Sequence, residues 1–182
     1  AATGIDLDTT IASLAATTSG VGSIDISETN ALTVSSAMTA NGAITIAAGG
    51  ALTATNVVST TDSDANDIRL TATTGNLVVG TVNAGTAGDV TLSAVAGAIT
   101  DGNGATTNVV ADVLTADAAT GIDLDTTIAS LDAETTAAGS IDINEANALT
   151  VTSAMAANGG IAITSGGALT VRSAVSTRSE ER

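Results

Sequence analysis

The chain has 182 residues, a net charge of −15 and 44% hydrophobic residues, and it lacks aromatic residues, cysteine, histidine, proline, lysine and glutamine. Four arginines against 19 carboxylates exclude nucleic-acid binding, which needs a basic surface to neutralise phosphates. The hydrophobic content excludes a disordered chain, and no apolar run approaches the roughly 18 residues that a membrane-spanning helix needs, so we expect no membrane insertion.

The composition predicts a thin and regular core. Alanine (37) and threonine (33) make up more than a third of the residues, and the larger apolar side chains are 14 isoleucines, 15 valines, 12 leucines and two methionines. Most globular cores depend on aromatic side chains, which bury the largest areas. A repeat protein does not need them, because each repeat packs only on its neighbours.

Short strands are expected wherever two aliphatic residues flank a single residue. A spacing of two is the period of a strand with one buried and one exposed face, and isoleucine, valine and threonine favour strands. In chain order the pairs are Ile5/Leu7, Ile24/Ile26, Ile44/Ile46, Ile68/Leu70, Val90/Leu92, Ile122/Leu124, Ile141/Ile143 and Ile161/Ile163.

A second aliphatic series follows these pairs and sets the period of the fold. Its members are Leu14, Leu32, Leu52, Leu77, Ile99, Leu114, Leu131, Leu149 and Leu169. The 117 residues from Leu14 to Leu131 divide into six turns of 19.5 residues. Glycine and asparagine between the strands, as at 41–42, 49–50, 83–85 and 101–104, tolerate positive φ and predict the corners. Only the stretch 93–121 cannot be assigned to particular turns from this spacing.

A large duplication underlies the short period. Residues 1–59 recur at 118–176 with 42 identities, and 1–14 and 118–131 are identical. The 17 differences gather at 15–21, 43–48 and 54–57. We therefore expect 1–182 to be a single solenoid segment, in which equivalent residues such as Ile5, Ile24 and Ile44 stack in a ladder.

One acidic segment has the spacing of a calcium loop. Asp62, Asp64 and Asn66 offer hard oxygen ligands in a D-x-D-x-N pattern. The sixth position, however, is Asp67 instead of glycine, and the twelfth is Thr73 instead of glutamate. A solvated loop is the favoured interpretation, and calcium binding there stays open. The sequence predicts no metal, catalytic or cofactor-binding residues.

The pairs Asp6/Asp8 and Asp123/Asp125 are the nearest approach to catalytic carboxylates. Without histidine, cysteine, lysine or tyrosine the chain lacks most general bases and nucleophiles. The second pair is the copy of the first in the duplicated block, as expected for surface residues of a repeat. We expect that the protein is not an enzyme. An ice-binding surface is also disfavoured, because the threonines are scattered.

Arginines crowd the last residues of the chain. Arg172, Arg178 and Arg182 replace neutral residues of the first copy, and they are expected to form a polar cap or a contact for an acidic neighbour. Leu169 would precede Ile5 of a following chain by nearly the same spacing as Leu52 precedes Ile68. Head-to-tail stacking of two chains would therefore continue the spacing of the turns. The unpaired strand edges at the ends of a coil favour such stacking.

The strings AATGIDLDTTIASL, GSIDI, ANGAITIAAGGALT, GDVTLSAVAGAITDGNGATTNVVA and ALTVTSAM resemble repeats of very large filamentous-haemagglutinin-like bacterial surface proteins. The resemblance spans essentially the whole chain. It implies a right-handed parallel β-helix that is secreted and held at the cell surface, with roles in adhesion, aggregation or biofilm matrix.

Together these observations predict an all-β, right-handed parallel β-solenoid of roughly nine turns, about 19–20 residues each. At about 4.8 Å per turn the rod would be roughly 45 Å long. The expected function is an extracellular structural shaft or filament module, with itself as partner, either head to tail or within a longer chain. The alternative is an adhesin module that recognises a glycan or a cell-surface partner.

Overall fold

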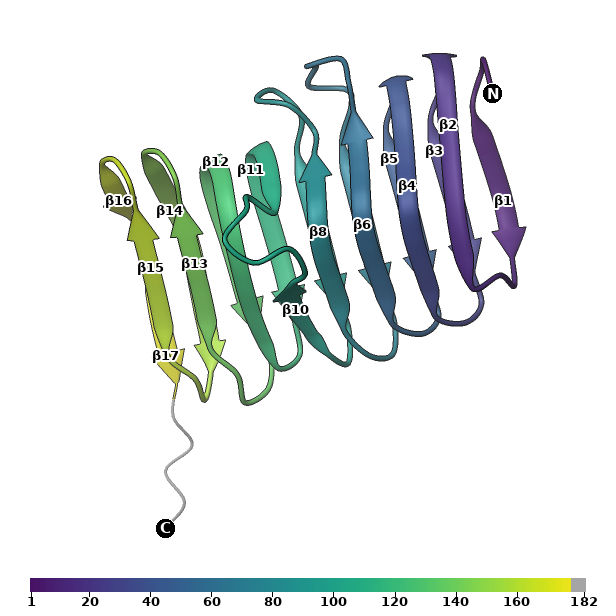
Figure 1. Ribbon diagram of the computed structural model, residues 1–182. Coiled ribbons are helices and arrows are strands. Elements are labelled where there is room, and N and C mark those ends of the chain that lie inside the picture. The colour runs from purple at the N-terminus through teal and green to yellow at the C-terminus, as the bar shows by residue number, and fades with distance from the viewer. Residues whose placement is uncertain (178–182) are drawn as a thin grey trace.

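The aliphatic pairs of the sequence form strands in the computed structural model, which describes residues 1–177. This part of the chain contains strands and no helix, and every strand pairing is parallel. The strands stack as a solenoid of about nine turns, with the first and the last strand at opposite ends (Figure 1). The predicted all-β parallel solenoid is confirmed.

In the first four turns a short strand alternates with a long one. The short strands are β1 (Ile5–Thr9), β3 (Ile24–Glu28), β5 (Ile44–Ala48), β7 (Ile68–Ala72) and then β9 (Val90–Ala94). The long strands are β2 (Ser13–Val21), β4 (Leu32–Asn41), β6 (Leu52–Ser59) and β8 (Leu77–Asn83). In Figure 1 the near strands run upward, the far strands run downward and successive turns advance from right to left, so the coil is right-handed.

Each long strand bends around a corner of the coil. In β4 the inward residues are first Leu32 and Val34 and then Ala37 and Thr39, so two consecutive residues point outward between them. Strict alternation is a property of a straight strand, and skipping one step turns the chain. The cross-section therefore has a short side and a longer, bent side.

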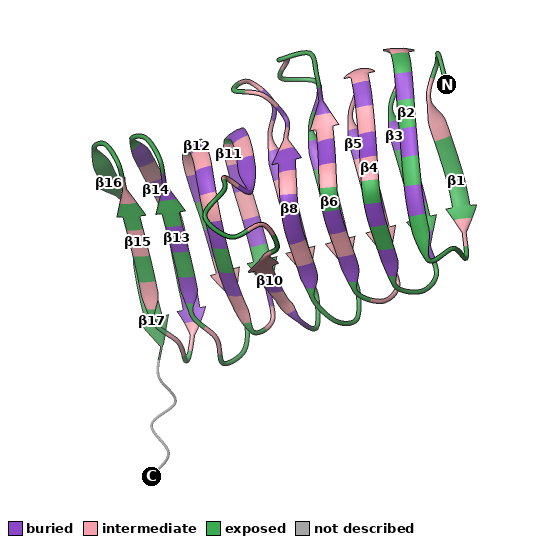
Figure 2. Ribbon diagram, viewed as in Figure 1, coloured by how far each residue is buried: buried purple, intermediate pink, exposed green. Residues whose placement is uncertain are grey.

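The remaining strands continue the same coil. They are β10 (Ala98–Asp101), β11 (Val109–Ala118), β12 (Gly121–Thr135), β13 (Ile141–Glu145), β14 (Leu149–Ala157), β15 (Ile161–Ser165), β16 (Leu169–Val171) and β17 (Ala174–Thr177). Inward positions along these strands are buried in alternation with exposed ones, as the bands of Figure 2 show. One cluster of isoleucine, leucine, valine and alanine side chains runs through the turns from Leu14 to Ala156.

Glycines stand at the predicted corners, but mostly for a different reason from the one expected. Gly42 has no positive φ, yet a Cβ there would collide with the carbonyl oxygen of Gly22 in the turn below. A Cβ at Gly49 would collide with the carbonyl oxygen of Thr29 in the same way. Close stacking of corner on corner thus requires glycine at these two positions. Positive φ explains others, since Gly85 does adopt it.

Two aliphatic ladders define the stacking. The first ladder runs through Ile5, Ile24, Ile44, Ile68, Val90, Leu114, Leu131, Val151 and Val171. The second ladder runs through Leu32, Leu52, Leu77, Ile99, Ile122, Ile141 and Ile161. The predicted stack of Ile5, Ile24 and Ile44 is confirmed. The first ladder makes eight steps from Ile5 to Val171, and a turn has about 20 residues.

The prediction of six turns within the long repeat is wrong. From Ile5 the first ladder reaches Leu114 after five turns, and its next step, from Leu114 to Leu131, is its shortest. Ile122, the counterpart of Ile5, lies midway along that step and belongs to the second ladder. The repeat therefore spans about five and a half turns. The second copy is rotated by half a turn about the axis of the solenoid.

The rotation takes place between β10 and β12, which we call the seam (residues 98–121). Residues 102–108 leave the coil as a loop, so that Val109 of β11 pairs directly with Val82 of β8. Strand β12 then continues through 15 residues without the break that separates β1 from β2 in the first copy. These two irregularities explain why 93–121 could not be placed from the sequence.

Asn108 holds the seam together from inside. Its side chain is fully buried, and its Nδ2 donates to the carbonyl oxygen of Val79 and to Oδ1 of Asp101, each at 2.8 Å. Its Oδ1 accepts from the backbone N–H of Asp125 at 2.7 Å. Buried polar groups are stable only when they are hydrogen-bonded. In Asn108 both the amide nitrogen and the amide oxygen have hydrogen-bond partners.

Candidate functional site

The two aspartate pairs do not form one site. Asp6 and Asp8 point outward from β1 on the side of the first ladder, and Asp123 and Asp125 point outward from β12 on the side of the second ladder. The half-turn rotation thus places identical sequences on different sides of the coil. A pair of carboxylates that works as acid and base must share one substrate, and these two pairs cannot.

Within each copy, aspartates stack on aspartates. Asp6 pairs with Asp25, and Asp123 pairs with Asp142. Burial raises the pKa of Asp123, and the neighbouring carboxylate of Asp142 adds to the rise. Like charges on adjacent strands are destabilising, so these columns weaken the fold at neutral pH.

The segment 62–67 uses its polar groups to hold the coil together. The Asp62 carboxylate accepts from the Thr86 hydroxyl and from the N–H of Ala87, each at 2.7 Å, and these bonds lower the pKa of Asp62. Asp67 Oδ1 accepts from the N–H of Asp89 at 3.0 Å. Within residues 1–177 no group of three or more acidic side chains is arranged to hold a metal ion.

Two buried glutamates form a repeated arrangement that the sequence analysis missed. Oε2 of Glu145 accepts from the Thr126 hydroxyl (2.8 Å) and from the N–H of Ile128 (2.9 Å), and Oε1 accepts from the N–H of Asn147 (2.9 Å). We call this arrangement a glutamate clasp, because it ties one turn to the corner of the next. Glu145 is only 1% exposed.

The counterpart in the first copy has the same geometry. Glu28 accepts from the Thr9 hydroxyl (2.6 Å) and from the N–H groups of Ile11 (2.8 Å) and Asn30 (3.1 Å). Burial raises the pKa of Glu28, but these hydrogen bonds outweigh burial and hold the pKa below its ordinary value of 4.5. The strand period carried the signal, because Glu28 continues the inward alternation of β3.

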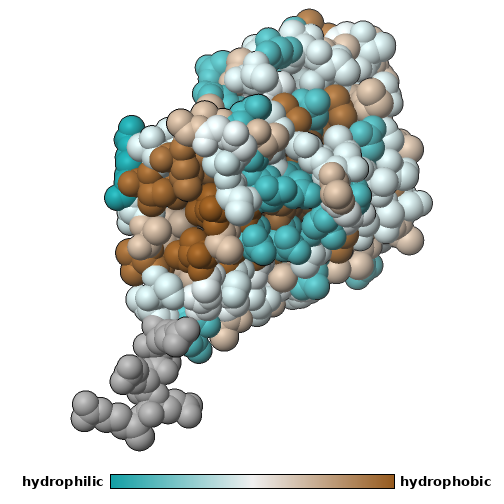
Figure 3. Space-filling view, turned by 60° about the vertical axis from the view of Figure 1, so that its left-hand side comes forward, coloured by the Kyte–Doolittle hydropathy of each residue, from teal (hydrophilic) through white to brown (hydrophobic). Residues whose placement is uncertain are grey.

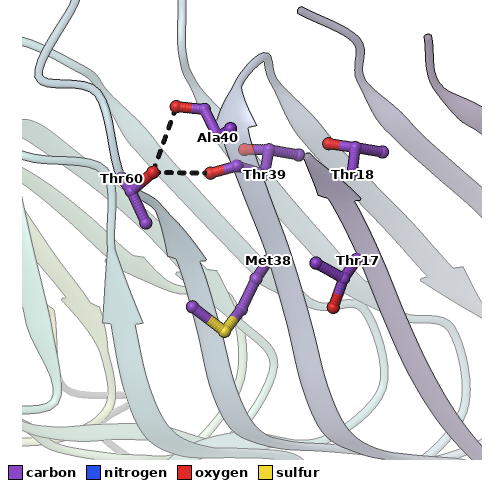
Figure 4. A pocket seen from close by; sticks show the side chains of 6 residues that line it. All are labelled: Thr17, Thr18, Met38, Thr39, Ala40 and Thr60. Atoms are coloured by element: carbon purple, nitrogen blue, oxygen red, sulfur yellow. Dashed lines mark hydrogen bonds between the residues drawn. The ribbon is translucent and has the colours of Figure 1, made fainter. Parts of the chain in front are cut away.

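An open groove crosses the bent side of the first turns (Figure 4). It is lined by Thr17, Thr18, Met38, Thr39, Ala40 and Thr60. Three of its four threonine hydroxyls bond to the chain itself. Thr18 donates to the oxygen of Gly22, Thr39 donates to the oxygen of Gly42, and Thr60 donates to the oxygens of Thr39 and Ala40. The groove contains no charged side chain to bind or activate a ligand.

A second groove holds one perturbed carboxylate. Asp117 lies beside Ser93, Val95 and Thr136, and burial, followed by Glu134 and Asp132, raises its pKa. The positive charge of Arg69 opposes this rise. The groove offers no aromatic platform for a sugar ring, and the raised pKa of Asp117 reflects burial first and the neighbouring carboxylates second.

Several large apolar side chains are exposed at the two ends of the coil. At the C-terminal end Leu169, Val171 and Val175 are 43–48% exposed, and Figure 3 shows apolar side chains gathered on this end. At the N-terminal end Leu7 is 47% exposed and Ile11 is 38% exposed. Leu169, Val171, Leu7 and Ile11 have buried counterparts in the middle of the rod, whereas Val175 points outward like Met155, on which it stacks.

The predicted arginine cap is only partly visible. Arg172 lies on the C-terminal turn and is exposed, whereas Arg178 and Arg182 lie outside the described residues.

No family model, curated protein or solved structure matches this chain. Residues 1–177 contain no helix of the length and apolar character that crossing a membrane requires.

Proposed function

We propose that the protein is a structural shaft: a rigid, non-catalytic rod segment of a large bacterial surface protein that acts outside the cell and associates end to end. The observation that carries the proposal is the aliphatic core, which runs as one cluster through the stacked turns from Leu14 to Ala156. A rod of this kind would give the larger protein length and stiffness. The resemblance to filamentous-haemagglutinin-like repeats supports the surface location.

The regularity of the sides supports a shaft over an adhesive surface. A recognition surface needs side chains that converge on a ligand, and usually aromatic or arginine anchors at its centre. The sides of this coil carry mainly threonine, serine, alanine and aspartate. In the groove on its bent side the hydroxyls of Thr18 and Thr39 already donate to backbone oxygens of the chain. The net charge of −15 keeps such rods apart laterally.

Analytical ultracentrifugation and negative-stain electron microscopy at rising protein concentration test the proposal. We expect rods whose length grows in multiples of one chain while their width stays constant, and growth should increase with salt because salt screens the negative charge. A particle that stays one chain long at all concentrations would refute end-to-end association. Binding to glycans or to cell surfaces by such a monomer would instead favour the adhesin alternative.

The surface location has its own test. Protease treatment of intact cells that express the full-length protein should remove the segment without lysis. Protection of the segment until the cells are broken would contradict an extracellular role.

A further inference from the structure

We propose that the asparagine–glycine pair formed by Asn103 and Gly104, in the loop of the seam, is a site of spontaneous deamidation. The side-chain amide of Asn103 is lost there, and aspartate or isoaspartate takes its place. The pair lies in the middle of the rod, with stacked turns on both sides, and the proposal does not depend on the shaft function.

Deamidation of asparagine is an intramolecular reaction that depends on the residue after it. The backbone nitrogen of that residue loses its proton and bonds to Cγ of the asparagine, while the bond from Cγ to Nδ2 breaks and ammonia leaves with the proton. Water then opens the resulting succinimide ring at one of its two carbonyl groups. Glycine favours ring closure, because it has no side chain to hinder the attack and the widest choice of backbone angles.

The sequence has three asparagine–glycine pairs, and two of them, counterparts in the two copies, are held in the stack of corners. The carbonyl oxygen of Asn41 accepts from the N–H of Gly22 (2.9 Å), and a Cβ on Gly42 would collide with the carbonyl oxygen of Gly22. In the second copy a Cβ on Gly159 would collide with the carbonyl oxygen of Gly139. The turn below therefore blocks rotation of either peptide group toward the asparagine side chain.

The third pair is free of this constraint. Gly104 is exposed, a Cβ on it would meet no atom within 4 Å, and its φ is +67°. It belongs to the loop 102–108, which leaves the coil between β10 and β11 (Figure 1). Its N–H donates to Oδ1 of Asp101 at 3.1 Å, so a nearby side chain holds it instead of the backbone of another turn. Of the three pairs, this one has the room that ring closure needs.

The adjacent aspartate–glycine pair could form the same ring, but the seam restrains it. The N–H of Gly102 donates to the carbonyl oxygen of Val79 at 2.8 Å. The hydrogen bond from Asn108 is the first cause that holds the pKa of Asp101 below its ordinary value, so its carboxyl group stays ionised. An ionised carboxylate is a poor target for a nucleophile. Ring formation in the loop is thus confined to Asn103.

Hydrogen bonds of the seam set the rate of the reaction. Nδ2 of Asn103 donates to the carbonyl oxygens of Gly80 (2.8 Å) and Thr107 (3.4 Å). Oδ1 of Asn103 accepts from Nδ2 of Asn108 at 2.9 Å. These bonds must break before Cγ can turn toward the nitrogen of Gly104, so deamidation follows local opening of the loop.

The product of the reaction cannot restore these contacts. A carboxylate at position 103 only accepts hydrogen bonds, so the carbonyl oxygen of Gly80 loses its donor. The new carboxylate also brings a second negative charge to Asn108, beside that of Asp101. The loop is therefore released, while β10 and β11 stay paired with β12 on either side of it. Deamidation is a one-way change that loosens the seam and leaves the ladders stacked.

Ageing of the full chain in warm, mildly alkaline buffer tests the proposal. Peptide mass spectrometry and enzymatic methylation of isoaspartate follow each pair. In the folded chain we expect Asn103 to react at least roughly tenfold faster than Asn41 and Asn158, because its loop opens locally. Asn41 is the matched control, since glycine and alanine follow it as they follow Asn103. In denaturant the three asparagines should react at similar rates.

Three results of the ageing experiment overturn the inference. The first is that Asn41 or Asn158 reacts as fast as Asn103 in the folded chain. The second is that Asn103 keeps its amide in the folded chain while denatured protein loses it. The third is that the rates in denaturant already differ as they do in the folded chain, because the local sequence would then decide and not the fold.

Two variants separate ring closure from loss of the fold. Gly104→Ala places a methyl group in open space and should slow the reaction of Asn103 severalfold, because the side chain hinders the attack. Asn108→Ala removes a restraint and should speed the reaction of Asn103 but not that of Asn41. An unchanged rate in Gly104→Ala would mean direct hydrolysis and contradict the inference. Faster reaction of Asn41 as well would show that Asn108→Ala unfolds, and Gly104→Ala then decides.

Discussion

The glutamate clasps are the clearest case of a single residue that organises the coil. Each carboxylate satisfies a hydroxyl and two backbone N–H groups at a corner, where strand pairing cannot reach them. Glu145 does so in a fully covered turn, and Glu28 does so next to the end of the rod, where Ile11 is 38% exposed. The same hydrogen bonds are therefore shielded from water to different extents.

Glu145→Ala should lower the free energy of unfolding by about 2–4 kcal/mol, because it leaves buried donors of Thr126 and Ile128 without acceptors. Chemical denaturation at pH 7 measures this loss. Glu28→Ala is the matched control and should cost less, because water can reach the N–H of Ile11. Equal losses in the two variants would contradict the importance of shielding.

The stabilising effect of Glu28 should depend on pH. Because its pKa is lowered in the folded chain, the clasp contributes stability above the ordinary value of 4.5, and this contribution disappears as the pH falls through the folded-state pKa. Glu28→Gln should therefore melt below the natural chain at pH 7 and approach it at acid pH. Thermal melts from pH 7 to pH 3 measure the difference.

Asp123→Asn provides a control of opposite sign. The pKa of Asp123 is raised, so its ionised form destabilises the fold at neutral pH and protonation relieves the penalty. Asp123→Asn should melt above the natural chain at pH 7, and this advantage should vanish toward acid pH. A pH-independent difference in either variant would show that its effect does not come from ionisation.

Among the elements, the seam between β10 and β12 is the least regular and the most dependent on polar contacts. Here the loop 102–108 replaces one side of a turn, and the next step of the first ladder is shortened. Asn108 bonds to both neighbouring turns, and its hydrogen bond lowers the pKa of Asp101. The ladders cross the seam without interruption because Ile99 stacks on Ile122 and Leu114 stacks on Leu131.

Asn108→Asp should destabilise the protein by about 2–4 kcal/mol at pH 7, because it turns a donor that faces Asp101 into a second carboxylate. Urea unfolding measures the change. Thr55→Asp is the control: its side chain is exposed, the substitution adds the same charge, and the variant should unfold within about 0.5 kcal/mol of the natural chain. A loss of similar size in both variants would point to net charge as the cause.

The strands were predictable from the sequence, and their stacking partners were predictable only in part. A spacing of two identified β1, β3 and β5 and their ladder, because local alternation decides which face is buried. The partner of β12 was not predictable, because it depends on how many residues each turn needs. The loop 102–108 and a missing corner shift the second copy by half a turn without changing any local pattern. Glu28 was readable as an inward residue, but its partners Thr9 and Ile11 belong to another turn.

At the scale of the molecule the rod is a chain of nearest-neighbour contacts. In such architectures stability is a sum over turns and their interfaces, and terminal turns have only one neighbour. The exposure of Leu7 and Leu169 shows this asymmetry directly. Local opening should therefore start at the ends.

Amide hydrogen exchange at low protein concentration should show this gradient. We expect the amides of β1–β2 and β15–β17 to exchange at least tenfold faster than those of β6–β8, which have a turn on each side. At concentrations where rods form, protection of the end strands should rise while that of β6–β8 stays unchanged. Uniform exchange along the chain would mean that the rod opens as one cooperative unit.

The half-turn rotation of the second copy bears on how a repeat protein of this kind can lengthen by gene duplication. A tandem duplication adds whatever length recombination copies, and here that length corresponds to about five and a half turns. The ladders nevertheless remain continuous, because isoleucine, leucine and valine substitute for one another at each step and one polar loop absorbs the misfit. Lengthening of the rod is therefore not restricted to insertions that contain a whole number of turns.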